Sequence, residues 1–235
     1  MSALFVLGHM RSYSSLLCHL LGSHPEIDGY CETHIKYRSW FDLLRLRRRV
    51  VKLTGERLSG RYVLDKILHD YPLAGSIVRT RSTRAIILIR SPVPTVRSIM
   101  NMGLRYSDIP WYRDSDAVAR YYETRLASLV RLADGLHTRA IWLAAEELLA
   151  GAAPVLTRLE AFLTLRVPLQ STYRQFAHTG EAGYGDPSEE ISKGRIGAAR
   201  ASDAHILLPE QLVARLEGAH RWAVAALRER CESLG

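Results

Sequence analysis

Cysteine is scarce in this chain. Only three cysteines occur in 235 residues, at Cys18, Cys31 and Cys231. Their number is odd, and their spacing matches neither a metal site nor a disulfide framework. Such sparse usage predicts free thiols in a reducing compartment, so we expect a cytoplasmic protein.

Long apolar runs are missing as well. The clearest one, Ala85 to Ile89, has the length of a buried strand, whereas a membrane-spanning helix needs roughly 18–20 apolar residues. The first residues, MSALFVLGHMRS, contain neither the basic region nor the small-residue cleavage site of a signal peptide. We therefore expect no membrane partner and no secretion signal.

Acidic residues are outnumbered by basic ones. The chain has 32 Lys and Arg against 24 Asp and Glu, a net charge of +8 with a pI near 9.6. This excess favours an anionic partner, which leaves nucleic acid, an acidic surface and a polyphosphorylated small molecule open. Part of the charge lies in one helical pattern, either a solvated helix face or a patch for an acidic acceptor or nucleic acid; it comprises Arg45, Arg47, Arg48, Arg49 and Lys52.

Apolar runs with strand character alternate with amphipathic stretches of helical period. The predicted strands are 3–7, 61–66, 84–90 and 139–144. The predicted helices are 14–22, 35–58, 92–102, 116–134, 146–150, 153–164 and 209–230, with Ser115 as N-cap and Gly135 as C-terminal stop of helix 116–134.

This alternation predicts an α/β fold. We expect one three-layer domain over residues 1–235, with a mostly parallel central sheet flanked by helices. Ligands in such folds bind beyond the carboxyl ends of the strands. The irregular segment 168–205 is too long for a simple connection, which indicates a functional loop.

The loop after the first strand has the composition of an anion site. The sequence LFVLGHMRSYSSLL puts Gly8 after a strand and the start of a helix near Ser14. Backbone N–H groups and a helix N-terminus therefore converge there. Arg11 adds a positive charge, and the serines add hydroxyl donors.

A nucleotide kinase is one alternative for this loop. The phosphate-binding pattern G-x-x-x-x-G-K-[ST] is matched at its ends by Gly8 and Ser15. Tyr13 stands at the second Gly and Ser14 at the Lys, and no strand-end Asp for magnesium is evident. A diverged P-loop kinase therefore fits less well than a phosphate loop of another kind.

The segment LGHMRSYSSLLCHLLGSHPEI resembles the 5'-phosphosulfate loop of sulfotransferases. Arg11 matches the basic residue of that loop, Ser12 its Ser, and Ser14 and Ser15 its two Thr positions. Tyr13 departs from the Gly of the family, which requires an unusual backbone there or a shifted loop.

Three further segments resemble the same family in the expected order. In LIRSPVPTVRSIM, Arg90 and Ser98 match the residues that bind the 3'-phosphate, with Ser91 replacing an Asp. The segment RAIWLAAEELLAGAAPVLTRLEAFLTL resembles a structural strand–helix unit that includes Glu146. SKGRIGAAR resembles the loop that wraps the 3'-phosphate and adenine, with Ser192 in place of an Arg.

The resemblance implies the donor and its contacts. The donor would be 3'-phosphoadenosine 5'-phosphosulfate (PAPS) and the product adenosine 3',5'-bisphosphate (3',5'-ADP), with no metal required. The expected donor-binding residues are Gly8, His9, Met10, Arg11, Ser12, Tyr13, Ser14, Ser15, Arg90, Ser98, Lys193, Gly194, Arg195 and Gly197.

Sulfuryl transfer also needs a general base near the acceptor. Glu32, in GYCETHIKY, is the first candidate, although it could instead cap a helix or pair with Lys36. His34 and His69 are rival bases. Lys66, at a strand end, is expected to contact the sulfuryl group, the alternative being an ion pair with a neighbouring Asp.

The acceptor is left open by the sequence. It would be a small molecule or carbohydrate carrying a hydroxyl or amine, bound by the regions 35–58 and 103–135, while 168–205 serves the donor and active site. Abundant Ala, Arg and Leu suggest a bacterial source, and a small molecule of secondary metabolism is one possible acceptor. A basic non-enzymatic protein that binds nucleic acid or another anion is a second alternative, but no nucleic-acid-binding motif is evident, so we expect no nucleic acid. The oligomeric state is not predicted.

Overall fold

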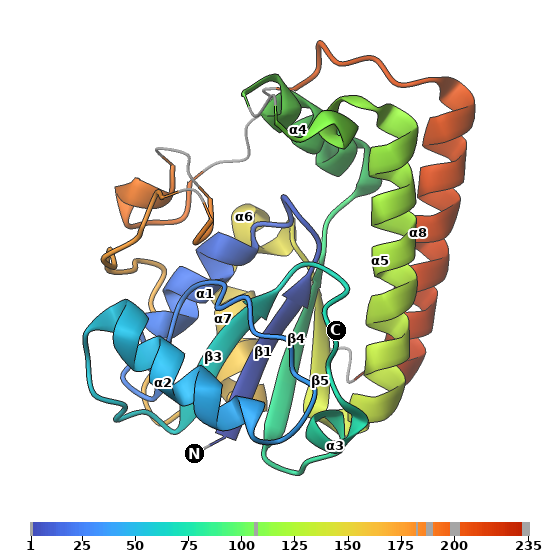
Figure 1. Ribbon diagram of the computed structural model, residues 1–235. Helices are drawn as coiled ribbons and strands as arrows, with labels where there is room; N and C mark the ends of the chain where they lie inside the picture. The colour runs from blue at the N-terminus through green and yellow to red at the C-terminus, as the bar shows by residue number, and fades with distance from the viewer. Residues whose placement is uncertain (1, 106–107, 182, 187–189, 198–202, 232–235) are drawn as a thin grey trace.

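The apolar runs of the sequence form the centre of the molecule. The computed structural model describes residues 2–105, 108–181, 183–186, 190–197 and 203–231. A five-stranded sheet has the order β2-β3-β1-β4-β5, with all neighbouring strands parallel (Figure 1). The strands are β1 (Ser2–Gly8), β2 (Ile27–Asp28), β3 (Tyr62–Ile67), β4 (Thr83–Ile89) and β5 (Ala140–Ala144).

Helices connect the strands at nearly every predicted position. The α-helices are α1 (Ser14–Gly22), α2 (Asp42–Thr54), α3 (Gly75–Val78), α4 (Pro92–Arg105), α5 (Ser115–Leu136), α6 (Glu147–Ala150), α7 (Ala152–Leu163) and α8 (Glu210–Arg230). Three short 3₁₀ turns are η1 (Pro110–Arg113), η2 (His137–Arg139) and η3 (Ile191–Lys193).

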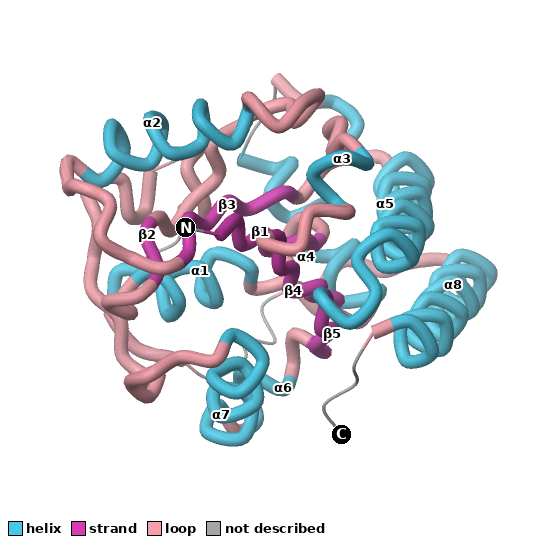
Figure 2. Tube along the Cα trace, turned by 90° about the horizontal axis from the view of Figure 1, so that it is seen from below, coloured by secondary structure: helices cyan, strands magenta, loops and turns pink. Residues whose placement is uncertain are grey.

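The sheet is covered on both faces, which confirms the predicted three-layer α/β fold. Alternate residues of β1 point to opposite faces. Leu4 and Val6 pack with α1 and α7, while Phe5 and Leu7 pack with α2, α5 and α8. Figure 2 shows α1 and α7 on one side of the strands and α2, α3 and α5 on the other, with α8 beside α5.

Three predictions at helix ends were wrong. The predicted helix 35–58 is helical only over α2, because Tyr37 leaves the helical path and donates from Oη to Asp65 Oδ2 at 2.6 Å. The N-cap of α5 is Asp114 rather than Ser115, since its Oδ1 accepts the N–H groups of Asp116 and Ala117.

Gly135 does not stop α5, which continues to Leu136. A β-carbon at this position would lie 2.6 Å from Cγ1 of Val78. The glycine therefore allows α5 to approach α3 closely rather than ending the helix. The three cysteines are buried and unpaired, as predicted. Within the described residues, no helix is both long and apolar enough to cross a membrane.

Candidate active site

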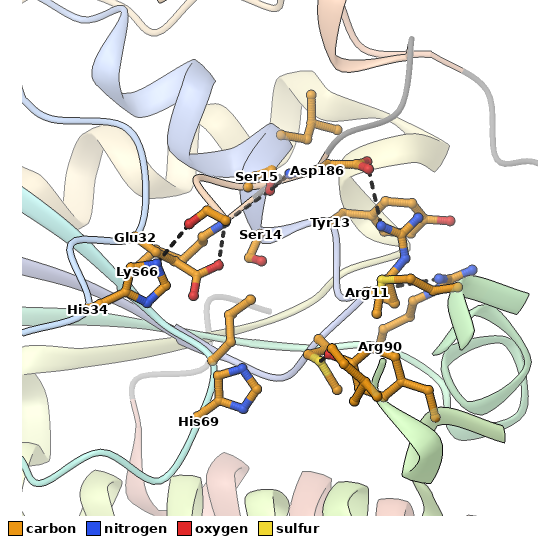
Figure 3. Close-up of a pocket in the computed structure, with 18 residues that line it drawn as sticks. Arg11, Tyr13, Ser14, Ser15, Glu32, His34, Lys66, His69, Arg90 and Asp186 are labelled. Carbon is orange, nitrogen blue, oxygen red and sulfur yellow. Dashed lines mark hydrogen bonds and ion pairs between the residues drawn. The ribbon is translucent and has the colours of Figure 1, made fainter. Parts of the chain in front are cut away.

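A pocket opens where the order of the parallel strands reverses. β1 lies between β3 and β4, and a cavity of about 390 Å³ lies beyond their carboxyl ends (Figure 3). Such a reversal is where open α/β sheets bind ligands. The lining residues are Met10, Arg11, Tyr13, Ser14, Ser15, Leu16, Glu32, His34, Lys66, Leu68, His69, Arg90, Met102, Ile109, Tyr112, Gly183, Gly185 and Asp186.

The loop after β1 has a strained backbone that Arg90 supports. Arg11 and Tyr13 adopt left-handed conformations, with φ of 62° and 59°, which non-glycine residues rarely occupy. The guanidinium of Arg90 lies 4.5 Å from the centre of the Tyr13 ring, and its Nη1 donates to Arg11 O at 3.0 Å. The unusual backbone predicted for Tyr13 is thus confirmed.

His9 joins this loop to the end of β4. The ring is fully buried; its Nδ1–H donates to Met10 O at 2.9 Å, and its Nε2 accepts the N–H of Arg90 at 3.0 Å. Burial lowers the pKa of His9 to about 3, so the ring is neutral at physiological pH. Ser12 donates to His9 O at 2.8 Å. Gly8, His9 and Ser12 therefore stabilise the loop without being among the described residues that line the pocket.

Glu32, Lys66 and Ser15 form a connected polar chain on one side of the pocket. Lys66 Nζ lies 3.2 Å from Glu32 Oε1 and donates to Ser15 Oγ at 3.0 Å. The Lys66 side chain is 1% exposed and that of Glu32 12%. In Figure 3 this chain lies opposite Arg11 and Arg90. Glu32 thus pairs with Lys66 rather than with Lys36.

Asp65 fixes the segment that carries Glu32. Its carboxylate accepts from Thr33 N at 2.9 Å, Thr33 Oγ1 at 2.6 Å and Tyr37 Oη at 2.6 Å. Burial raises the pKa of Asp65 to about 6, while these hydrogen bonds act in the opposite direction. This role was not predicted from the sequence; the signal was an Asp inside a strand that is apolar except for Asp65 and Lys66.

Residues 183–186, from the predicted functional loop 168–205, lie across the phosphate loop. Asp186 Oδ1 pairs with Arg11 Nη1 at 3.1 Å, and Asp186 N donates to Ser15 Oγ at 2.9 Å. His34 Nε2 donates to Gly183 O at 2.7 Å. Arg11 Nε donates to Ser98 Oγ at 3.0 Å, which brings Ser98 to the same loop. Arg11 therefore already binds a carboxylate at the pocket.

Comparisons with known proteins agree with this geometry. No protein-family profile matches the chain, and no curated protein matches it in sequence. Among solved structures, the sulfotransferase domain of the curacin biosynthetic pathway aligns with a TM-score of 0.66 at 16% identity, over 93% of this chain and 96% of that one. The chain has a sulfotransferase fold. The resemblance noted in the sequence therefore extends to the whole architecture.

Two further sulfotransferase structures align over nearly the whole chain. The domain from the olefin synthase of Synechococcus PCC 7002 has a TM-score of 0.59 at 20% identity, covering 94% of each chain. The sulfotransferase of Alicyclobacillus acidocaldarius has a TM-score of 0.59 at 14% identity, covering 97% of this chain and 95% of the other. At these identities the likeness establishes the fold.

The final motif of the sulfotransferase resemblance lies away from the pocket. Lys193 Nζ pairs with Glu190 Oε1 at 2.7 Å, and Gly194 O accepts the N–H of Tyr173 at 2.9 Å. Arg195 forms a backbone bridge with Thr172. In the described part of the chain, the pocket lining includes neither these residues nor Gly197. Their donor-binding role stays a prediction.

His69 faces the same pocket as Glu32. Its ring lies between those of Tyr71 and Tyr121, with centres 5.8 Å and 5.7 Å away, and Figure 3 shows it on the side away from Ser15. Burial lowers the pKa of His69, which favours the neutral ring. Both side chains therefore remain candidates for the general base.

Helix α5 supports the pocket from below, which the sequence analysis missed. Arg125, 1% exposed, donates from Nε to Gly8 O and from Nη2 to Ile67 O, both at 2.8 Å, and from Nη1 to Asp70 Oδ1 at 2.9 Å. It thereby joins the ends of β1 and β3. Tyr121 Oη receives the N–H of Met10 and donates to Leu68 O.

Tyr122 extends this support to β4, because its Oη donates to Arg90 O at 2.8 Å. The signal for all three residues was available in the sequence. Polar side chains at 121, 122 and 125 lie on a helix whose other inward residues are apolar. A buried arginine on such a face requires several acceptors.

The positive charge at the pocket comes from arginine and lysine. Within the described residues, no three His, Cys, Asp or Glu side chains gather in a way that could hold a metal ion. Arg11, Lys66 and Arg90 instead supply three positive groups around one cavity. Such a set suits a polyanionic ligand.

Proposed function

We propose that this protein is a sulfotransferase that moves a sulfuryl group from PAPS to a hydroxyl or amine. The observation that carries the proposal is the chain Glu32–Lys66–Ser15, with contacts of 3.2 and 3.0 Å. It joins a candidate base to the phosphate loop through one buried ammonium. The sulfotransferase fold supports the same reaction class.

The residues around the pocket fit the anionic groups of PAPS. Arg11 already binds the carboxylate of Asp186, so an anion is accommodated at its guanidinium. Ser14 and Ser15 offer hydroxyls beside it. Arg90 and Ser98 both contact Arg11, which suits the binding of the 3'-phosphate next to the 5'-phosphosulfate.

In the proposed reaction the acceptor oxygen or nitrogen forms a bond to sulfur while the bond from sulfur to the bridging phosphate oxygen breaks. Glu32 takes the acceptor proton, and the electron pair of the broken bond leaves on 3',5'-ADP. Negative charge grows on the bridging oxygen, where Arg11 and Lys66 stabilise it. These fixed cations supply the charge compensation, so the proposal needs no metal.

Calorimetric titration with 3',5'-ADP in the absence of magnesium tests the donor site. We expect micromolar binding by the wild type and a loss of at least tenfold in Arg90→Ala. The matched control is Arg120→Ala on the exposed side of α5, which should bind like the wild type. Thermal unfolding of each variant verifies that it is folded.

A second variant separates chemistry from binding. Glu32→Gln keeps the size of the side chain and removes the base, so it should bind 3',5'-ADP but lose at least 10²-fold in transfer rate. Full activity in Glu32→Gln would show that Glu32 is not the base and would leave His69 as the candidate. No binding of 3',5'-ADP by the folded wild type would overturn the proposal and direct the search to ATP with magnesium and then to nucleic acid.

The structural neighbours also bear on the biological setting. One belongs to the curacin biosynthetic pathway and another to an olefin synthase. These relationships support a small-molecule acceptor and a bacterial biosynthetic role.

A further inference from the structure

The two sides of the pocket differ in chemistry. Polar groups gather around the phosphate loop and Glu32. Thioether, aliphatic and aromatic side chains from four parts of the chain form another group in the lining, which we term the apolar wall; it comprises Met10, Leu68, Met102, Ile109 and Tyr112. This wall is not needed to hold phosphate or sulfate, so its chemistry indicates what else the pocket binds.

The apolar wall is held together by packing between α4 and η1. A β-carbon on Gly103 would lie 2.7 Å from Cβ of Tyr112, so the glycine lets η1 lie directly on α4. Arg113 Nε donates to Gly103 O at 2.9 Å, and Tyr112 Oη donates to Met10 Sδ at 3.5 Å. The wall is therefore a formed surface connected to the phosphate loop.

From these observations we infer that the acceptor is an uncharged alcohol or phenol on an apolar body that packs against the apolar wall. The inference rests on the proposed sulfotransferase function and narrows its acceptor. The reactive O–H would lie beside Glu32, and the remainder of the molecule would contact Met10, Leu68 and Met102. This conclusion disfavours the carbohydrate that the sequence left open.

The physical reason is the difference in the free-energy cost of removing water from a sugar and from an apolar molecule. A sugar ring that entered the pocket would remove water from several hydroxyls, and thioether and methyl groups offer them no hydrogen bonds. An apolar body loses no hydrogen bonds and gains contact area. His69, flanked by Tyr71 and Tyr121, adds a further ring at the edge of the pocket.

Charge points to the same class. The cations of the pocket serve the phosphate loop: Arg11 contacts Asp186 and Ser98, and Lys66 contacts Glu32 and Ser15. The apolar wall as defined above consists entirely of uncharged side chains. An acidic acceptor would find no counter-ion there, which argues against a charged body on the acceptor.

The test uses 2-naphthol as apolar probe and methyl N-acetylglucosaminide as sugar probe. With PAPS, we expect kcat/KM for 2-naphthol to exceed that for the sugar by about 10²-fold. Binding of 2-naphthol is also measured directly by its fluorescence, with and without saturating 3',5'-ADP, so the readout does not depend on turnover. Sugar transfer as fast as naphthol transfer would overturn the inference.

A matched pair of variants locates the contact. Met102→Glu puts a charge on the apolar wall and should weaken 2-naphthol binding at least tenfold, with the affinity for 3',5'-ADP within about twofold of wild type. Leu104→Glu makes the same type of change two residues along α4, where the side chain is 64% exposed, and should alter neither affinity. Equal naphthol affinities in the two variants would overturn the inference.

The two readouts distinguish failure of the inference from failure of the proposed function. If 3',5'-ADP does not bind, the sulfotransferase proposal falls, but loss of naphthol binding in Met102→Glu alone still assigns the apolar wall as a ligand site. If 3',5'-ADP binds and 2-naphthol does not, the proposed function stands and the apolar acceptor is wrong.

Discussion

Two of the segments that resemble donor-binding motifs are built very differently. The loop over residues 9–15 is held from outside by Arg90, which follows β4, and by Tyr121 of α5, while its own His9 ring is buried. The polar contacts described for the segment 190–197 are mainly within the segment itself, at Glu190, and with Tyr173 of the same irregular stretch. A motif becomes a rigid site when buried groups outside it determine its backbone.

This difference follows from topology. The loop 9–15 leaves the central strand of a parallel sheet, so the ends of β3 and β4 and the side chains of α5 surround it. The segment 190–197 follows α7 at the far end of a long irregular stretch, and Ile191 anchors it to the core on the α7 side. Substitutions that remove the supports of each segment test this difference between the two motifs.

The largest effect is expected when Arg125 is replaced. Arg125→Met keeps an apolar stem but leaves Gly8 O and Ile67 O, both buried behind the pocket, without their donor. Breaking a buried charged interaction of this kind costs about 3–5 kcal/mol. Urea denaturation should show that decrease in the free energy of unfolding.

The matched control for Arg125→Met is Arg120→Met on the same helix, where the side chain is exposed. This surface change should stay within about 0.5 kcal/mol of wild type. Equal stabilities of the two variants would mean that the loop 9–15 does not depend on α5.

A smaller effect concerns pH and His9. Its pKa falls from 6.5 to about 3 on folding, so between these values the unfolded chain binds more protons than the folded one. The contribution of neutral His9 to the free energy of unfolding is therefore fully present above pH 6.5, and it decreases as the pH falls below that value. His9→Gln should reduce the stability difference between pH 7 and pH 5 by about 2 kcal/mol.

Urea denaturation at the two pH values measures this difference. His19, whose pKa burial lowers to about 4, contributes in the same direction in every variant, so comparison with the wild type isolates His9. His205→Gln replaces an exposed histidine and should leave the wild-type pH dependence. An unchanged pH dependence in His9→Gln would show that the ring is not held neutral as described.

The sequence predicted the parts of this molecule that depend on local patterns. Strands of buried apolar residues and amphipathic helices have strong periodic signals, and Gly8 and Arg11 lie where a strand meets a helix. The unusual backbone at Tyr13 was one of two outcomes expected where this residue replaces a glycine, the other being a shifted loop. These features are encoded within a few consecutive residues.

The missed features depend on contacts between distant residues. Arg125 meets Gly8 across 117 positions, and Asp186 reaches Ser15 across 171. No local period encodes such pairs, although a charged residue on a buried face marks one partner, as Asp65 does within β3. The sequence therefore identified the pocket loop and the helix α5, but not the support that α5 gives to this loop.

The smallest effect is expected in the segment 190–197. Lys193→Ala removes an exposed side chain paired with Glu190, and surface pairs of this kind contribute little. Lys193 is also not among the residues that line the described pocket. The dissociation constant for 3',5'-ADP should therefore change by less than about threefold, against the donor-binding role that the sequence motif predicts, and compared with at least tenfold for Arg90→Ala in the same calorimetric series. A tenfold loss in Lys193→Ala would instead show that this segment moves onto the donor when it binds. The difference between the loop 9–15 and the segment 190–197 would then exist only in the protein without its donor. Support by buried groups before binding would no longer decide which of the two motifs contributes donor affinity.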